Sequence, residues 1–255
     1  SDWMAVVDHI ASLNAGLDLE MPGKGDPSTA EILAGLQDKK ISTKQLDLAA
    51  GRVLSMVTTL LNQQQPNATY DRAAHHQFAR KLAADGIVLL KNAQNVLPVA
   101  PTDKLAFIGV MADHPRYQGA GSSHVTPDHV VSALAAAKSA GLNVTYAPGY
   151  SLDVGEIDND LQTAAVKLAR KADTVIIFVG YRDRDESEGF DKTSLSLPEN
   201  QTALIQALSR AVKKLVVVLA NGSVVEMPWR NQVTAIVETY LAGEAVGEAT
   251  IDILT

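Results

Sequence analysis

The sequence predicts an α/β protein in which helices cover both faces of a mostly parallel β-sheet. Short apolar runs such as Thr174–Val179 (TVIIFV) and Leu215–Ala220 (LVVVLA) have the length and the branched residues of buried strands. Amphipathic helical patterns lie between these runs, and this alternation is typical of a parallel sheet. With 255 residues, of which 46% are hydrophobic, the chain is long enough to bury a large core.

The first 61 residues have a less regular pattern of their own. Apolar residues at helical spacing predict helices over Met4–Asn14 and Ile41–Leu61, and Ser42 is a suitable N-cap for the second helix. Between them, Gly16–Pro22 (GLDLEMP) has the pattern of a short strand that ends at Pro and Gly. This block is small for a domain, so we expect it to be one or two β/α units of a larger structure.

A polar stretch, Asn62–Asp71 (NQQQPNATYD), separates this block from a second one in which helices and strands alternate regularly. The expected helices lie at 73–85, 130–140, 158–171 and 198–211. The expected strands lie at 87–91, 105–110, 143–146, 174–179, 215–220 and 235–240. The pairs Ala140-Gly141 and Asn221-Gly222 fit the turns between such elements.

Composition excludes several classes of protein. The formal net charge of −7 argues against a nucleic-acid partner, because a phosphate-binding face needs clustered Lys and Arg. No apolar run approaches the roughly 20 residues that span a bilayer, so no membrane partner is expected. The absence of cysteine excludes disulfides, a thiol nucleophile and a Cys-ligated zinc site. Composition leaves the compartment open, and any signal peptide would have to precede Ser1.

The segment Gly180–Gln201 holds the densest group of charged residues. It follows the predicted strand Thr174–Val179, and ligands of open α/β sheets bind beyond the carboxyl ends of the strands. Between residues 182 and 192 the loop carries five carboxylates and three cations: Asp183, Asp185, Glu186, Glu188, Asp191, Arg182, Arg184 and Lys192. Two interpretations stay open on the residues alone, a solvated surface loop and an active-site loop.

A second candidate is the Gly-rich segment Gly119–Ser123, which precedes a predicted helix. It lacks the Gly-Lys-Ser/Thr of a P-loop, and His124 stands where a dinucleotide fingerprint needs its third glycine, so a nucleotide site is disfavoured. We expect instead a loop that borders a cleft. Its hydroxyl-binding groups would be Ser122, Ser123 and His124.

Three other chemistries have weaker support. Asp183, Asp185 and Ser187 have the spacing of a calcium loop, but Glu188 occupies the position that needs glycine. The neighbours His75 and His76 point in different directions on a helix, which favours a surface or packing role over metal ligation. No Gly-x-Ser-x-Gly elbow supports Ser-His-Asp catalysis. No metal and no cofactor are therefore expected.

Several motifs in order along the chain resemble glycoside hydrolase family 3, specifically its two-domain β-glucosidase-like members. The motifs are Ser1-Asp2-Trp3, Asn14–Gly23 (NAGLDLEMPG), Ala49–Leu54 (AAGRVL), His76–Asn92 followed by Leu97-Pro98, Gly119–Pro127 (GAGSSHVTP), Glu188–Gln201 with its Leu-x-Leu-Pro-x-x-Gln, and Gly243–Leu254. The resemblance implies that residues 1–61 are the C-terminal end of a (β/α)8 TIM barrel and residues 62–80 a linker. Residues 81–255 would form an α/β sandwich domain with a mostly parallel sheet.

The resemblance also assigns roles to single residues. Asp2 would be the nucleophile and Trp3 a wall of the sugar site, with Ser122 and Ser123 binding substrate. Glu188 would be the general acid/base, with Glu186 as the fallback. We expect the neighbouring Asp191 to disfavour ionisation of Glu188, which is the direction that an acid catalyst needs. Lys192 stands where the family usually has Arg, which would weaken a bidentate contact there.

These roles imply a retaining, exo-acting β-glycosidase that cleaves a β-glucoside or oligosaccharide through a covalent glycosyl–aspartate intermediate. A xylosidase or arabinosidase stays possible, whereas the family's N-acetylglucosaminidases, which use a His/Asp pair from the barrel, would not need Glu188. The alternative from another class is a non-catalytic carbohydrate-binding or structural module. The other barrel strands are expected on a missing segment of the same protein, so the chain alone should hydrolyse nothing efficiently. A homo-oligomer is also compatible with the pattern.

Overall fold

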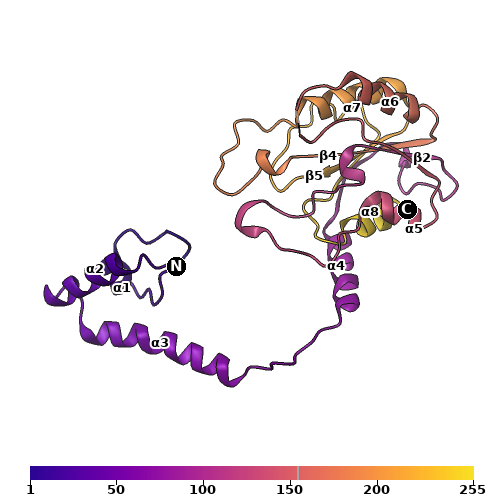
Figure 1. The fold of residues 1–255 in the computed structure, drawn as a ribbon. Coiled ribbons are helices and arrows are strands. Elements are labelled where there is room, and N and C mark those ends of the chain that lie inside the picture. The colour runs from indigo at the N-terminus through magenta and orange to yellow at the C-terminus, as the bar shows by residue number, and fades with distance from the viewer. Residues whose placement is uncertain (154) are drawn as a thin grey trace. The chain divides into compact units, whose positions relative to one another are not determined.

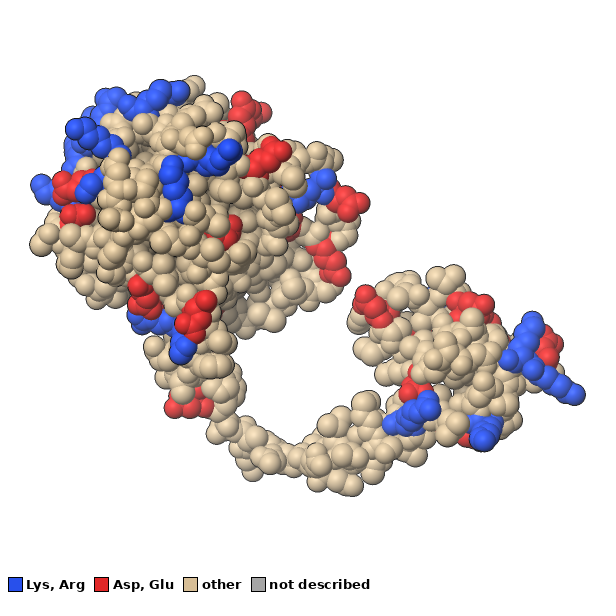
Figure 2. All heavy atoms as spheres, turned by 180° about the vertical axis from the view of Figure 1, so that it is seen from behind, with Lys and Arg blue, Asp and Glu red and all other residues tan. Residues whose placement is uncertain are grey.

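The computed structural model describes residues 1–153 and 155–255. The chain divides into two compact units, Ser1–Tyr70 and Asp71–Thr255. In both units, charged side chains of either sign are separated by larger uncharged areas (Figure 2), in line with the 20% of charged residues in the sequence.

The first unit consists of three helices, α1 (His9–Asn14), α2 (Asp26–Gln37) and α3 (Thr43–Asn62) (Figure 1). The expected N-cap of α3 is confirmed, because the Ser42 hydroxyl accepts a hydrogen bond from the amide of Gln45 at 3.2 Å. The Gln45 side chain in turn accepts from the amide of Ser42 at 2.8 Å and completes a capping box.

The first unit differs from the expectation at one predicted strand and at one helix that was not predicted. The segment Gly16–Pro22 is not a strand, because residues 1–70 contain no second strand with which it could pair. Its amides bond elsewhere, Leu17 to the carbonyl of Ser12 and Met21 to the hydroxyl of Ser1, both at 2.9 Å. Helix α2 was not expected, and residues 1–70 contain no strand to accompany these helices.

The second unit is built on a six-stranded sheet with the order β1-β6-β5-β4-β2-β3 (Figure 1). Strand β1 is antiparallel to β6, and all other neighbours are parallel, as the sequence predicts. The strands are β1 (Val88–Asn92), β2 (Leu105–Ile108), β3 (Val144–Ala147), β4 (Thr174–Gly180), β5 (Leu215–Ala220) and β6 (Ala235–Glu238).

Helices cover both faces of this sheet. Helices α6 and α7 lie on one face and α5 and α8 on the other, with α4 packed against α8 (Figure 1). The helices are α4 (Arg72–Gly86), α5 (Ala133–Ser139), α6 (Asn159–Ala169), α7 (Glu199–Ala211) and α8 (Val246–Leu254). The polar stretch Asn62–Asp71 leads directly into α4, because Asp71 caps this helix and accepts from the amide of Ala74 at 3.0 Å. Helix α8 was not predicted.

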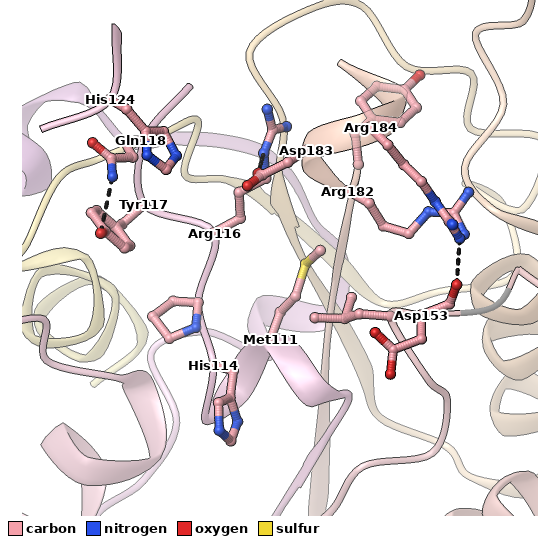
Figure 3. Close-up of a pocket in the computed structure, with 13 residues that line it drawn as sticks. Met111, His114, Arg116, Tyr117, Gln118, His124, Asp153, Arg182, Asp183 and Arg184 are labelled. Atoms are coloured by element: carbon pink, nitrogen blue, oxygen red, sulfur yellow. Dashed lines mark hydrogen bonds and ion pairs between the residues drawn. The ribbon is translucent and has the colours of Figure 1, made fainter. Parts of the chain in front are cut away.

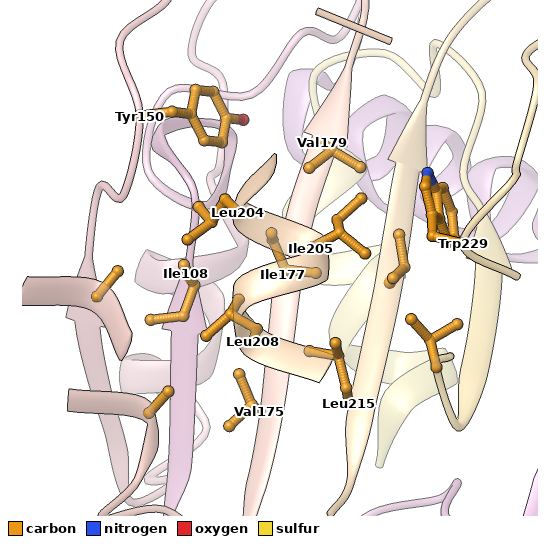
Figure 4. Packing of buried hydrophobic residues seen from close by; sticks show 14 of the residues in the cluster. Ile108, Tyr150, Val175, Ile177, Val179, Leu204, Ile205, Leu208, Leu215 and Trp229 are labelled. Carbon is orange, nitrogen blue, oxygen red and sulfur yellow. The ribbon is translucent and has the colours of Figure 1, made fainter. Parts of the chain in front are cut away.

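The core is divided by the sheet into two layers because alternate residues of a strand face opposite sides. Ile177 of β4 packs with Leu204 and Leu208 of α7 (Figure 4). Its neighbour Phe178 lies on the other side, where its ring is 5.1 Å from that of Phe107. Burial of a leucine side chain such as that of Leu204 contributes about 1.5–3 kcal/mol to the free energy of folding.

The order of the strands creates one special position at the carboxyl edge of the sheet. Strands β2 and β4 are neighbours, but the chain leaves β2 for β3 on one side and returns to β4 on the other. Ligands of doubly wound sheets bind at such a switch point. The segments that follow β2 and β4 meet there.

Candidate functional site

The loop that follows β4 starts from a firmly held backbone. The Gln201 amide donates to the carbonyl of Gly180 and accepts from its N–H, both at 2.9 Å and both buried. A Cβ at Gly180 would lie 2.0 Å from the carbonyl oxygen of Ala220, so only glycine fits here. The side chain of Gln201, near the start of α7, therefore pairs with the backbone of Gly180 as a residue of a neighbouring strand would.

Glu186 is anchored inside the loop by several donors. Its carboxylate pairs with Arg116 Nη1 and accepts from the hydroxyl of Ser223 and from the N–H of Gly222, the last at 2.9 Å. Arg116 also donates through Nη2 to the Glu186 carbonyl at 2.9 Å and through Nε to Asp183 at 3.2 Å. The side chains of Arg116 and Glu186 are only 5% and 14% exposed. We call this group the anchor.

The anchor keeps Glu186 ionised. Burial by itself raises the pKa of Glu186, but the bonds from Ser223 and Gly222 and the charge of Arg116 outweigh it, so the pKa is lowered. With its oxygens occupied by these partners, the Glu186 carboxylate is not accessible to a substrate.

Glu188 has a different setting only two positions later. Its side chain is exposed, and Oε2 accepts from the N–H of Ser122 at 2.8 Å and from the Ser122 hydroxyl. These two bonds lower the pKa of Glu188. The expected rise from Asp191 is therefore wrong for this arrangement, since hydrogen bonds to the charged form decide the direction.

Lys192 packs onto the same loop. Its Nζ lies 3.1 Å from the centre of the Tyr181 ring and donates to the Ser223 hydroxyl at 2.9 Å. Burial is the main cause of the lowered pKa of Lys192. The Tyr181 hydroxyl donates to the carbonyl of Leu195 at 2.7 Å. Tyr181 at the start of the loop therefore contacts both Lys192 and Leu195.

A pocket of about 530 Å³ lies at the switch point between β2 and β4 (Figure 3). It is lined from the segment after β2, the segment after β3 and the start of the loop after β4. The polar lining residues are His114, Arg116, Tyr117, Gln118, His124, Asp153, Tyr181, Arg182, Asp183 and Arg184. The lining therefore offers both hydrogen-bond donors and acceptors to a ligand.

The structure brings some of the predicted site residues together. Ser122 meets Glu188, whereas the Ser123 hydroxyl points to the carbonyl of Ala120 at 3.5 Å. His124 lines the pocket. Asp2 and Trp3 belong to the first unit, where Asp2 accepts from the Trp3 N–H at 2.7 Å and the indole is 67% exposed.

His76, one of the two neighbouring histidines, packs between helices. His76 is buried, with Nδ1 2.8 Å from Glu244 and Nε2 2.6 Å from Glu248, and its ring stacks on His129. It links α4 to α8, as the packing interpretation predicts. Within 1–153 and 155–255, no group of three or more His, Asp or Glu residues could hold a metal ion.

Sequence reasoning missed Arg116 and Ser223. Both lie far from the loop in the sequence, Arg116 by 70 positions from Glu186. The charge of the loop could have indicated them. Five carboxylates close together need cations and hydroxyl groups from other segments as partners when some of them are buried.

Comparison with known proteins places this arrangement in a family. Residues 87–255 match the model of the glycosyl hydrolase family 3 C-terminal domain. The chain belongs to glycosyl hydrolase family 3. The fold of the second unit, an α/β fold with a mostly parallel sheet, is that of this family domain.

Three family 3 relatives match over the whole chain. The chain is 43% identical to thermostable beta-glucosidase B of Acetivibrio thermocellus and 39% identical to an exo-alpha-(1->6)-L-arabinopyranosidase of Bifidobacterium longum, covering 34% and 35% of those proteins. A crystal structure of a Bifidobacterium adolescentis GH3 beta-glucosidase matches with a TM-score of 0.92 and 40% identity, over 37% of its chain. This family 3 chain thus spans about a third of the length of its curated relatives. None of its described helices has the length and apolar character of a membrane span.

Proposed function

We propose that the chain is part of a retaining, exo-acting β-glycosidase of the β-glucosidase type, with Asp2 as nucleophile and Glu188 as general acid/base. The observation that carries this proposal is the contrast within the loop after β4. Glu186 is locked by Arg116 and Ser223, so Glu188 is the carboxylate free to meet a substrate. Similarity over the whole chain to enzymes named as glycosidases supports it.

In this mechanism protonated Glu188 gives its proton to the glycosidic oxygen while Asp2 attacks the anomeric carbon and the bond to the leaving group breaks. Ionised Glu188 then takes a proton from the water that hydrolyses the glycosyl–Asp2 ester. The two carboxyl groups of a retaining enzyme work about 5–5.5 Å apart. Trp3, Ser122 and Ser123 would contact the sugar.

We further propose that residues 1–61 belong to the C-terminal end of a (β/α)8 barrel and residues 81–255 to the α/β sandwich domain, with the domain boundary in 62–80. Two facts support this. Helix α3 leaves large apolar side chains exposed, among them Leu54 at 66% and Leu60 at 59%. The curated relatives are also about three times as long as this chain. An apolar face of this kind is normally covered by neighbouring elements.

The decisive experiment is Glu188→Gln in a polypeptide that also contains the rest of the barrel, assayed on aryl β-glucosides. Loss of a general acid/base is expected to cost about 10²–10⁴ in rate. The loss should shrink as the leaving group becomes more acidic, because such a group departs without a proton. Glu186→Gln is the matched control, and its effect should not depend on the leaving group.

Two outcomes would contradict the assignment. Full activity of Glu188→Gln would favour a non-catalytic carbohydrate-binding or structural module. A loss that depends on the leaving group in Glu186→Gln instead would move the catalytic role to Glu186.

A second candidate substrate follows from the relative named as an arabinopyranosidase, which is almost as similar to this chain as the beta-glucosidase. A panel of aryl β-D-glucoside, β-D-xyloside and α-L-arabinopyranoside measures the choice directly. We expect the highest kcat/KM on the glucoside, and a higher value on either pentoside would replace it.

A further inference from the structure

The short turn Gly121–Ser123 is shaped around the carboxylate of Glu188. The Ser122 N–H and the Ser122 hydroxyl both donate to Oε2, the N–H at 2.8 Å. Among the described residues, no other group donates to this carboxylate. Two parallel donors on one oxygen recognise a charged carboxylate better than a neutral one.

Gly121 makes this close approach possible. A Cβ at this position would lie 2.8 Å from Glu188 Cβ and 2.9 Å from Oε2, and the φ of +82° is itself unfavourable for other residues. Gly189, directly after Glu188, also has a positive φ but meets nothing within 4 Å. Glu188 is therefore in close contact with the turn at Gly121, while its side chain stays exposed.

We propose that the Gly121–Ser123 turn is a cradle that stores ionised Glu188 between its two proton transfers, with Ser122 as a positioning residue. This inference rests on the proposed acid/base role of Glu188. After Glu188 has given its proton to the leaving oxygen, the cradle receives the carboxylate and holds it as the base for the incoming water. Taking the proton from that water weakens both bonds and releases Glu188 for the next cycle.

The charged groups near Glu188 do not take over the stabilisation of its carboxylate by Ser122. The segment carrying Ser122 has Arg116 and His124, and the loop itself carries Arg182, Asp183, Arg184, Asp185, Glu186, Asp191 and Lys192. Arg116 is occupied by Glu186 and Asp183. The two bonds from Ser122 are what lowers the pKa of Glu188.

The cradle can be tested in the 255-residue chain without any activity. Glutamate labelled with ¹³C at Cδ allows the carboxyl groups to be titrated by NMR, and Glu188→Gln assigns the signal. Ser122→Ala should raise the pKa of Glu188, while Ser122→Thr, which keeps the hydroxyl and the N–H, should restore the lowered value. The matched control is Ser123→Ala, which should leave this pKa unchanged. Equal pKa values in Ser122→Ala and Ser123→Ala would overturn the cradle.

Gly121→Ala provides an independent test that keeps Ser122. The added methyl group should displace Glu188 and raise its pKa in the same direction as Ser122→Ala. A pKa that stays at the wild-type value in Gly121→Ala would show that Glu188 does not lie in the turn in solution.

Kinetics of the barrel-containing polypeptide separate this proposal from the proposed function. The pH dependence of kcat/KM reports groups of the free enzyme, and an acid catalyst loses activity as the pH rises through its pKa. Ser122→Ala should therefore move the alkaline limb of kcat/KM to higher pH, a change that a purely structural role would not produce. If Glu188→Gln lowers the rate but Ser122→Ala leaves this limb in place, the cradle fails and the acid/base role stands. If Glu188→Gln is fully active, the proposed function fails.

Discussion

Glu186 and Glu188 are two positions apart but differ in burial and in the number of hydrogen-bond partners. Glu186 is nearly buried, and an arginine, a hydroxyl and a backbone N–H hold its carboxylate. Glu188 is exposed, and one serine supplies both of its bonds. The difference shows how one acidic loop can serve two purposes, since a charge enclosed by fixed partners stabilises the fold and an accessible one is available for chemistry.

The largest expected effect comes from breaking the anchor. Arg116→Met leaves Glu186 buried without its counter-charge, and we expect the free energy of unfolding of the second unit to fall by about 3 kcal/mol, the lower end of the range for a broken buried ion pair. Urea unfolding followed by the fluorescence of buried Trp229, in a Trp3→Phe background, measures this unit alone. Glu188→Gln is the control and should stay within about 0.5 kcal/mol of the parent. Equal stabilities of the two variants would remove the distinction between the glutamates.

Acid should weaken the anchor. The folded-state pKa of Glu186 lies below the ordinary value of 4.5, so its contribution to stability is present above that value and is lost as the pH falls through the lowered pKa. The difference in stability between the parent and Arg116→Met should therefore narrow when urea unfolding is repeated below the ordinary pKa. A gap that stays constant with pH would mean that packing by Arg116, not its charge, stabilises the loop.

A smaller effect is expected at the base of the loop. Gln201→Ala leaves the buried N–H and C=O of Gly180 without their partner, at a cost of about 1–3 kcal/mol. Gln118 makes the same pair of bonds to Val125 in an exposed position, at 3.1 and 3.0 Å, so Gln118→Ala is a geometric control. We expect that control to lose less than about 0.5 kcal/mol in the same unfolding experiment. Similar losses in both variants would show that burial does not set the cost.

The smallest effect concerns Lys192. Lys192→Met removes the contact with the Tyr181 ring and should cost about 0.5–1 kcal/mol, because the ammonium lies directly over the ring. The exposed Lys214→Met is the comparison. If the two variants unfold at the same urea concentration, Lys192 does not stabilise the loop.

Elements that depend on local sequence patterns could be predicted, whereas elements that depend on contacts with distant positions could not. The strand expected at Thr174–Val179 differs from β4 by one residue, because a run of branched apolar residues is a local signal. Helix α2 was missed because its apolar residues form only a weak stripe, and its start depends on Gly25 in a left-handed conformation. A strand at Gly16–Pro22 was predicted from local pattern alone, although a strand needs a partner.

The candidate site shows the same limit. The loop with Glu186 and Glu188 was recognisable from its position after a buried strand and from its motif. The different settings of the two glutamates were not, because they depend on Arg116, Ser122 and Ser223, which are 37 to 70 positions away along the chain. No local pattern contains that information.

The link through His76 has a consequence for the connectivity of the second unit. It joins α4 to α8, and Arg80 adds a salt bridge to Asp252 at 2.5 Å. Two segments that lie 168 to 172 positions apart in the sequence are therefore fastened side by side. A cut in an exposed loop between them should leave α4 and α8 in contact and the order of the strands unchanged.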